Sequence, residues 1–497
     1  MNSSKKAGAL LALALVAGGG WGCSDFLNGP GLTENPNNPI QVTPIQLLIS
    51  VQANMAVRME GQVARCASVF TQQLIGSNNQ QLQWCTGYGV GEGDISGQMS
   101  GFYTGGGLLG LRSVEAAATT AGDNVMLGMA KIWEGFAMGT ATSVWGDLPY
   151  SEAVTPGIDS PKLDSQQSIY AAVQTRLDEG IAALTTAAAT ASGNCAPSEG
   201  DLIYCATAVS RATQIGRWIR AAHTLKARYH LHLVERAATP ATEYAAALAE
   251  AQLGINERPI GVNNAIDGQG PGDFRFFHGS VQDFDANIWG EFLLARQDIV
   301  AGNVLIQMLK ARNDTARMRR YFDPNTAIPA QFVGADQNNA TVRPAGCPAP
   351  PAACAPSVIN LAVRRAFTFR QPMITWAENQ LIMAEARFRT GDSTGGAVNV
   401  DSVRVAMGLP SLVAATFVDV MSEKYIALFQ NIEVWSDYKR TCLPTLVPNG
   451  TAPEVLGRLP YGSAERNANA NVPLPASYPT GTTGSSAVRN WDDPNRC

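Results

Sequence analysis

Two separate segments of the chain combine aromatic rings with amide and carboxylate groups, and this combination suits a sugar ligand. Sugars present apolar C–H faces that pack against flat rings, and hydroxyl groups that exchange hydrogen bonds with Asn, Gln and Asp. The segments are GSNNQQLQWCTGYG, residues 76–89, and DFRFFHGSVQDFDANIW, residues 273–289. The candidate ligand-binding side chains are Asn78, Asn79, Gln81, Trp84, Tyr88, Asp285, Asn287 and Trp289.

The aromatic residues of these segments have a second interpretation, because rings of this size also pack loops onto a protein core. Phe276 and Phe277 are the stronger candidates for that role. Trp84 and Trp289 are the stronger candidates for a ligand platform, and a disulfide between Cys66 and Cys85 would hold Trp84 in place.

Residue patterns that could support catalysis are present, but their spacing argues against it. Thr104–Gly110, TGGGLLG, contains a G-x-G-x-x-G without the preceding strand that a dinucleotide site needs. His223 and His230 lie seven residues apart on one predicted helix, and Glu378 and Glu385 do so on another.

Seven helical residues rise about 10.5 Å, a poor match to the carboxylate pair of a glycoside hydrolase. Bonds to neighbouring helices are the simpler role for these side chains. The sequence contains no P-loop and no H-E-x-x-H. We therefore expect no catalytic residue, no cofactor and no metal.

The first 22 residues have the features of an export signal. Two lysines precede a short apolar run, Ala7–Val16, which is too short to span a bilayer. Small residues then lead to Cys23, the arrangement in which a bacterial lipoprotein is cleaved and lipidated on cysteine. Gly20 replaces the usual leucine and Trp21 is bulky, so an ordinary secreted protein with one spare thiol is the alternative.

The remaining cysteines favour lipidation of Cys23, because setting it aside leaves an even number, eight of nine. An even number is expected of an exported, oxidised chain, although eight cysteines allow 105 pairings. Pairing of sequence neighbours is the simplest scheme. It gives Cys66–Cys85, Cys195–Cys205, Cys347–Cys354 and Cys442–Cys497.

Apolar residues recur at spacings of three and four through most of the chain after residue 43, which predicts a mainly α fold with little β structure. Asp164 is the predicted N-cap of one helix, with Gln167 as its capping-box partner. Ala-rich faces, as in ITWAENQLIMAEARFRTGD, would let helices approach closely as tetratricopeptide-like hairpins. The predicted helices cover 43–75, 108–121, 124–145, 165–187, 207–236, 241–255, 298–312, 372–390, 395–407 and 415–440.

Several segments, in order along the chain, resemble those of the SusD/RagB family of nutrient-binding surface lipoproteins. A further residue, Cys442, stands where that family commonly has glycine. The segments are NPNNP, KIWEGFAMGTATSVWGDLPYSEAV, RWIRAAHTLKARYHLHL, RMRRYFDP, ITWAENQLIMAEARFRTGD, EKYIALFQNIEVWSDYKRTCLP (resembling a long C-terminal helix), GRLPYGSAERNANANVP and VRNWDD.

The resemblance implies a domain organisation. It comprises a lipoprotein signal peptide at 1–22, a flexible tether at 23–42 and a SusD-like domain at 43–497. Its helical scaffold would lie mainly in 43–75, 108–257 and 372–440. Loop-rich parts would lie in 76–107, 258–371 and 441–497, and would hold the ligand. In this family, ligand contacts commonly come from the loop after the first long helix and from the middle insertion. By order along the chain, these positions correspond to residues 76–89 and 273–289.

The resemblance also implies a function. The protein would be lipid-anchored in the outer membrane, facing the cell exterior, and would not be an enzyme. It would bind oligosaccharides, or peptides as some members do, and pass them to a TonB-dependent, SusC-like transporter barrel. The net charge of −5 argues against nucleic acid as a partner. A structural or adhesive surface lipoprotein is the alternative, and a glycan hydrolase is a weaker one.

Overall fold

The structure, a computed structural model, describes residues 42–324, 331–338, 355–473, 490, 492, 493 and 497. Cys23, the signal and nearly all of the tether, and the Cys347–Cys354 pair lie outside these residues. The chain forms two compact units, Met1–Gln46 and Leu47–Cys497. In the first, the Gln46 backbone N–H donates to Thr43 Oγ1 at 3.3 Å, and the Thr43 backbone N–H donates to Gln46 Oε1 at 3.0 Å. This reciprocal cap precedes the first described helix.

Helices dominate the described residues, and the fold prediction, mainly α with helical hairpins and little β, is confirmed. A short π-helix, η1 (Gln81–Thr86), and a 3-10 turn, η2 (Pro197–Glu199), accompany the α-helices. The α-helices are α3 (Pro44–Glu60), α4 (Gln62–Phe70), α5 (Ser96–Ser100), α6 (Leu108–Ala121), α7 (Asn124–Trp145), α8 (Gln166–Ala188), α9 (Arg211–Leu233), α10 (Pro240–Leu253), α11 (Val262–Ile266), α12 (Ile288–Ala295), α13 (Asn303–Ala311), α14 (Thr315–Tyr321), α15 (Trp376–Thr390), α16 (Ser393–Ala406), α17 (Phe417–Ala427), α18 (Glu433–Thr441) and α19 (Ser463–Ala468).

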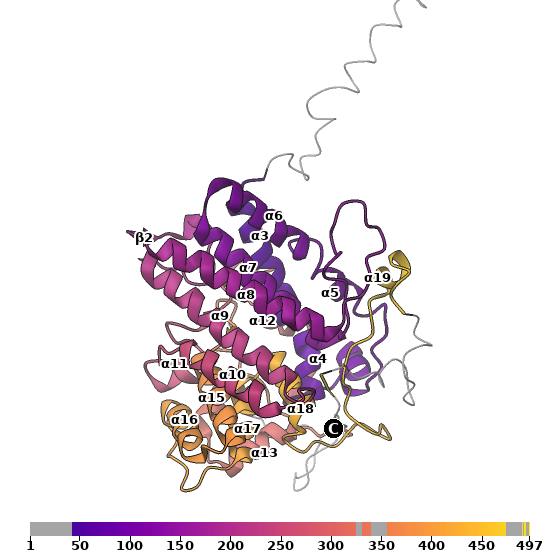
Figure 1. Ribbon diagram of the computed structural model, residues 1–497. Helices are drawn as coiled ribbons and strands as arrows, with labels where there is room; N and C mark the ends of the chain where they lie inside the picture. The colour runs from indigo at the N-terminus through magenta and orange to yellow at the C-terminus, as the bar shows by residue number, and fades with distance from the viewer. Residues whose placement is uncertain (1–41, 325–330, 339–354, 474–489, 491, 494–496) are drawn as a thin grey trace, which may run out of the picture. The chain divides into compact units, whose positions relative to one another are not determined.

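Consecutive helices pack against each other as hairpins: α6 with α7, α7 with α8, α8 with α9 and α9 with α10. The series then continues with α15, which packs on α10 and is followed by α16 and α17 (Figure 1). Residues 254–375 therefore form an insertion between two neighbouring helices of the scaffold. This insertion carries the second of the two predicted ligand-binding segments.

Glycine allows α7 and α8 to approach closely. A Cβ added to Gly128 would lie 2.5 Å from Leu184 Cγ, and one added to Gly180 would lie 2.8 Å from Ile132 Cγ1. Neither contact is compatible with a larger side chain at the present helix separation. The small residues on these helix faces are therefore a packing requirement.

The strands form short antiparallel pairs that join segments distant in sequence. β1 (Leu74–Gly76) pairs with β5 (Ile299–Ala301), and β4 (Phe274–Arg275) pairs with β8 (Pro372–Ile374). β2 (Asn194–Cys195) pairs with β3 (Val209–Ser210), and β6 (Phe322–Asp323) pairs with β7 (Val358–Ile359). The β1–β5 pair ties the insertion to the segment that follows α4. The β4–β8 and β6–β7 pairs each join two parts of the insertion.

Several predicted helices are divided in the structure. The stretch 43–75 is α3 and α4, separated at Gly61, where an added Cβ would lie 2.2 Å from the Val57 carbonyl oxygen. The stretch 298–312 begins as strand β5. The long C-terminal helix is α17 and α18, with Gln430 between them at φ +65°. Conversely, α12 lies in a part that we expected to be loop-rich.

The predicted N-cap of α8 was wrong by one residue. Ser165, not Asp164, caps this helix, and its hydroxyl accepts from the Ser168 backbone N–H at 3.2 Å. Asp164 Oδ2 instead accepts from the backbone N–H groups of Tyr150 and Ser151, at 3.0 and 2.7 Å. It thus holds the turn that follows α7.

Three of the predicted disulfides are present: Cys66–Cys85, Cys195–Cys205 and Cys442–Cys497. Cys442 is the C-cap of α18 with φ +53°, a left-handed conformation that glycine adopts most easily. Cys442 therefore holds a backbone conformation that glycine would adopt at lower cost.

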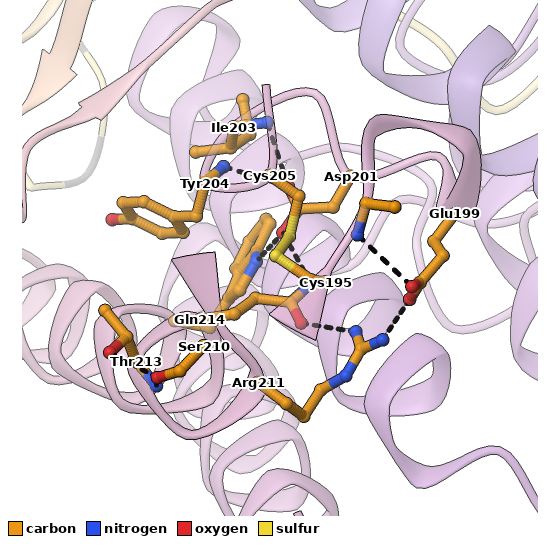
Figure 2. Close-up of a disulfide and its surroundings, with 12 residues drawn as sticks. Cys195, Glu199, Asp201, Ile203, Tyr204, Cys205, Ser210, Arg211, Thr213 and Gln214 are labelled. Carbon is orange, nitrogen blue, oxygen red and sulfur yellow. Dashed lines mark hydrogen bonds and ion pairs between the residues drawn. A yellow bond between two sulfur atoms is a disulfide. The ribbon is translucent and has the colours of Figure 1, made fainter. Parts of the chain in front are cut away.

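Asp201 organises the loop closed by Cys195–Cys205 (Figure 2). Its Oδ1 accepts from the backbone N–H of Ile203 at 2.9 Å, and its Oδ2 accepts from Gln214 Nε2 and Trp218 Nε1, each at 2.8 Å. The carboxylate is fully buried. The loop is therefore held both by the disulfide and by hydrogen bonds to α9.

Candidate functional site

The structure joins the first predicted ligand-binding segment, residues 76–89, to residues that follow the second predicted segment, residues 273–289. The pairing of β1 with β5 places residues 77–84 beside residues 292–298. Asn79 Nδ2 donates to Asp298 Oδ1 at 2.9 Å, and Arg296 Nη1 donates to Gln80 Oε1 at 3.0 Å. We call residues 77–84 and 292–298, together with Arg65 of α4, the paired-loop face.

Trp84 is the predicted aromatic residue that remains partly accessible on this face. It lies in η1, half-buried against the core, and the Cys66–Cys85 disulfide fixes η1 to α4. Asn78 and Asn79 are exposed near the start of the same segment. A rigid half-buried ring beside exposed amides is an arrangement that can receive a sugar.

Gln81 and Tyr88 face the interior. Gln81 Nε2 donates to Gln62 Oε1 at 2.8 Å, and the Tyr88 ring meets the Phe70 ring edge-on at 5.9 Å between centroids. Burial raises the pKa of Tyr88 to about 12. Both side chains are buried and are therefore not accessible to a ligand here.

Asp285, Asn287 and Trp289 shape the insertion. Asn287 Oδ1 accepts from the Trp289 backbone N–H at 3.0 Å and so caps α12, while Asp285 Oδ1 accepts from the Val281 backbone N–H at 2.9 Å. Asn287 and Trp289 are completely buried. Trp289 therefore cannot form an exposed platform with Trp84 in this structure, because its ring packs the core.

Phe276 and Phe277 differ in role. Phe276 is buried and stacks on Trp133 with centroids 5.7 Å apart, as the core interpretation predicted. Phe277 is 43% exposed, so for this residue the core interpretation was wrong. The alternation follows from the extended backbone near β4, which sends neighbouring side chains to opposite sides.

The sequence analysis missed three residues of the face: Arg65, Phe292 and Arg296. The Arg65 guanidinium carbon lies 4.1 Å from the Phe292 ring centre, and that of Arg296 lies 6.0 Å from it. The signal available for Phe292 was Asn287, a good N-cap, followed by the apolar pattern of α12. Arg65 gave no signal, because its position depends on a contact between distant segments.

The Glu378 and Glu385 carboxylates form buried ion pairs. This confirms the prediction that they bind neighbouring helices. Arg228 donates to both oxygens of Glu378, at 2.6 and 2.7 Å. Arg440 and Lys424 bind Glu385. Both carboxylates are completely buried and therefore have no access to a substrate.

His223 and His230 of α9 bind different partners. His223 Nδ1 lies 2.6 Å from Glu250 Oε2, and His230 Nδ1 lies 2.7 Å from Glu243 Oε2. Both partners belong to α10. The histidines therefore join two helices of the scaffold.

A carboxylate pair that spacing did not suggest, Glu115 and Glu134, lies between α6, α7 and α8. Burial and the Glu134 carboxylate raise the pKa of Glu115 to about 7. Arg176 lies 3.5 Å from Glu115 Oε2 and 3.2 Å from Glu134 Oε1, and the Tyr150 hydroxyl donates to Glu134 at 2.7 Å. Glu134 is completely buried, so the pair serves helix packing.

An open hollow of about 280 Å³ lies between the start of α7 and the end of α8. Its described lining contains no aromatic ring; it includes Asp123, Asn124, Thr190 and Arg211. Without a ring to pack against a sugar face, this hollow is a weaker glycan site than the paired-loop face.

Comparison with known proteins gives a consistent result. The SusD-like family model, described as "Starch-binding associating with outer membrane", matches residues 36–400. No curated protein matches the sequence.

Solved structures match over most of the chain. A SusD/RagB family protein from Bacteroides thetaiotaomicron is 19% identical over 92% of this chain and 100% of its own, with a TM-score of 0.65. A chitin-binding SusD homologue from Flavobacterium johnsoniae is 18% identical over 91% and 98%, with a TM-score of 0.66. A SusD homologue from Bacteroides uniformis is 17% identical over 90% and 99%, with a TM-score of 0.62. These identities establish similarity of fold.

Proposed function

The chain belongs to the SusD-like family, described as starch-binding and associating with the outer membrane, and we propose that it captures oligosaccharides outside the cell. It would pass them to a TonB-dependent, SusC-like transporter barrel. The family membership supports the nutrient-binding role, and one solved structure of the same fold is of a chitin-binding protein.

The observation that carries this proposal is the paired-loop face. Two segments separated by some two hundred residues meet there, and a half-buried Trp84 lies in the same segment as exposed Asn78 and Asn79. Loops held by a rigid scaffold often carry binding residues, so a partly accessible ring near exposed amides favours a binding site. The proposed ligand contacts are Trp84, Asn78 and Asn79; peptides are a second class of ligand for the same face.

Attachment to the membrane is proposed to be through lipid on Cys23. Within the described residues, none of the helices is both long enough and apolar enough to cross a bilayer. The sequence of the signal and Cys23 supports a lipid-anchored protein on the outer face of the outer membrane.

This location and partnership can be tested together. We expect that metabolic labelling with a fatty acid marks the wild-type protein and not Cys23→Ala, and that a TonB-dependent barrel copurifies from detergent-solubilised outer membrane. Equal labelling of the two proteins would contradict the lipid anchor. Absence of a barrel partner would contradict delivery to a transporter and would favour an adhesive or structural role.

Trp84→Ala is expected to weaken binding of an oligosaccharide identified by array screening by about 1–3 kcal/mol, by analogy with aromatic hot spots. Because the ring is only half-buried, the melting temperature should change little. Calorimetric titration and thermal denaturation measure the two effects. Phe388→Ala, which removes another partly buried ring on α15, is the control and should leave affinity unchanged. Normal affinity in Trp84→Ala, or its unfolding, would assign Trp84 to the scaffold.

A further inference from the structure

Two arginines of the paired-loop face share one aromatic ring. The guanidinium carbons of Arg65 and Arg296 both lie within 6.0 Å of the centre of the Phe292 ring. Arg65 belongs to α4, and Arg296 is the residue at which α12 ends. Two positive charges from distant segments therefore lie close to one aromatic ring.

The hydrogen bonds of Arg65 fix its position without neutralising it. Its Nε and Nη2 donate to Gln62 Oε1 at 3.3 and 3.2 Å, and the same oxygen accepts from Gln81 Nε2. Gln62 Nε2 in turn lies 3.3 Å from the sulfur atoms of Cys66 and Cys85. The guanidinium is thus linked through Gln62 to the disulfide that also fixes Trp84.

Neither arginine has an ion pair with a carboxylate among the described residues. Arg296 donates to the neutral Gln80. Asp298, the acidic residue of the face, is buried and bound by Asn79. Buried arginines elsewhere in the chain do have such partners, as Arg228 has Glu378 and Arg317 has Glu423.

The electrostatic consequence is an unfavourable free energy that a bound anion would relieve. Burial and the nearby charge of Arg296 lower the pKa of Arg65 to about 9, although it stays protonated at neutral pH. Arg65 is only 9% exposed. A buried cation beside a second cation is costly, and the net charge of −5 shows that these arginines are not part of a generally basic protein.

We propose that the ligand of the paired-loop face is an anionic oligosaccharide, whose carboxylate or sulfate groups bind the exposed Arg296 and are attracted by the nearby charge of Arg65, while a sugar ring packs on Trp84. This inference rests on the proposed function, because it names the ligand class of the same face. Guanidinium groups suit carboxylate and sulfate oxygens, since they can donate two parallel hydrogen bonds.

Calorimetric titration of the mature chain would compare oligogalacturonates and heparin-derived sulfated oligosaccharides with neutral chito- and malto-oligosaccharides of equal length. At least one anionic series should bind about tenfold more tightly than the neutral ones, and its affinity should fall as salt rises. Arg296→Gln should weaken that binding about tenfold, as expected for loss of a charged hydrogen bond. Arg319→Gln, at an exposed arginine of α14, is the matched control and should bind as the wild type does.

Arg296→Gln is the main variant because its side chain is exposed, whereas Arg65→Gln is informative only if its melting temperature is unchanged. Equal or tighter binding of neutral oligosaccharides, with no effect of Arg296→Gln, would overturn the anionic ligand and leave glycan capture intact. Binding of neither class would overturn both proposals. In that case Arg296 would be a cation placed at the negative end of α12.

Discussion

Glu385→Gln is expected to lower the free energy of unfolding by about 3–5 kcal/mol, because it breaks a buried cluster of four charges. Lys424 Nζ lies 3.2 Å from Glu385 Oε2 and 2.8 Å from Asp437 Oδ1. Arg440 also binds both carboxylates, and its Nη2 lies 2.8 Å from Asp437 Oδ1. All four side chains are buried. The variant would leave two cations facing one carboxylate, without water to replace the lost partner.

The effect should depend on pH with a definite sign. Burial alone would raise the pKa of Glu385, but Arg440 and Lys424 outweigh it and lower the pKa below its ordinary value. A carboxylate whose pKa is lower in the folded protein stabilises the fold at pH values above the ordinary pKa of glutamate. This stabilisation is lost as the pH falls through the pKa of the folded state. The difference between wild type and Glu385→Gln should therefore be largest near neutral pH and should narrow on acidification.

Denaturant unfolding, followed by tryptophan fluorescence at several pH values, measures the free energy of unfolding and its pH dependence. Glu179→Gln is the matched control: its carboxylate binds Lys131 and Arg176 at 2.6 and 2.9 Å, but its side chain is 44% exposed. Exposed pairs contribute about 1 kcal/mol or less. If Glu385→Gln cost no more than the control, the cluster would not be contributing to stability as its burial implies.

The helical scaffold could be predicted because its signals are local. Apolar spacing gave 108–121 as a helix, and α6 spans the same residues. Glu378 and Glu385 were expected to bind neighbouring helices, and their partners on α9, α17 and α18 bear this out. Periodicity did not reveal the break at Gly61, which arises from a close approach to the preceding helical turn.

The candidate site was only partly predictable, because it is assembled by long-range contacts. Residue types selected Trp84 and Trp289 equally well, yet Trp289 is buried and Trp84 is not. Trp289 lies in the first turn of α12, which Asn287 caps, and its ring is buried in the core. Arg65 joins the face only because β1 pairs with β5, and no local pattern predicts that pairing.

We expect removal of the Cys442–Cys497 disulfide to lower the free energy of unfolding by a similarly large amount. A cross-link stabilises mainly by restricting the unfolded chain, and the restriction grows with the length of the closed loop. The sequence separation is 55 residues for this bridge and 10 for Cys195–Cys205. Loop entropy then gives about 4 kcal/mol for the first and about 3 kcal/mol for the second. Paired Cys→Ser variants, compared by denaturant unfolding, test this order.

A larger loss of stability on removing Cys195–Cys205 than on removing Cys442–Cys497 would be equally informative about the native state. Loss of Cys442–Cys497 leaves other contacts of the C-terminal residues intact, since Asn490 Nδ2 donates to the Ser143 carbonyl and the Asp492 backbone N–H donates to Gln166 Oε1. Loss of Cys195–Cys205 instead disturbs the loop that Asp201 organises (Figure 2), in which Asp201 also accepts from Trp218 Nε1. A larger cost for the shorter bridge would therefore show that hydrogen bonds around Asp201, and not loop entropy, set its contribution. Asp201→Asn would then reproduce most of that cost with both cysteines in place.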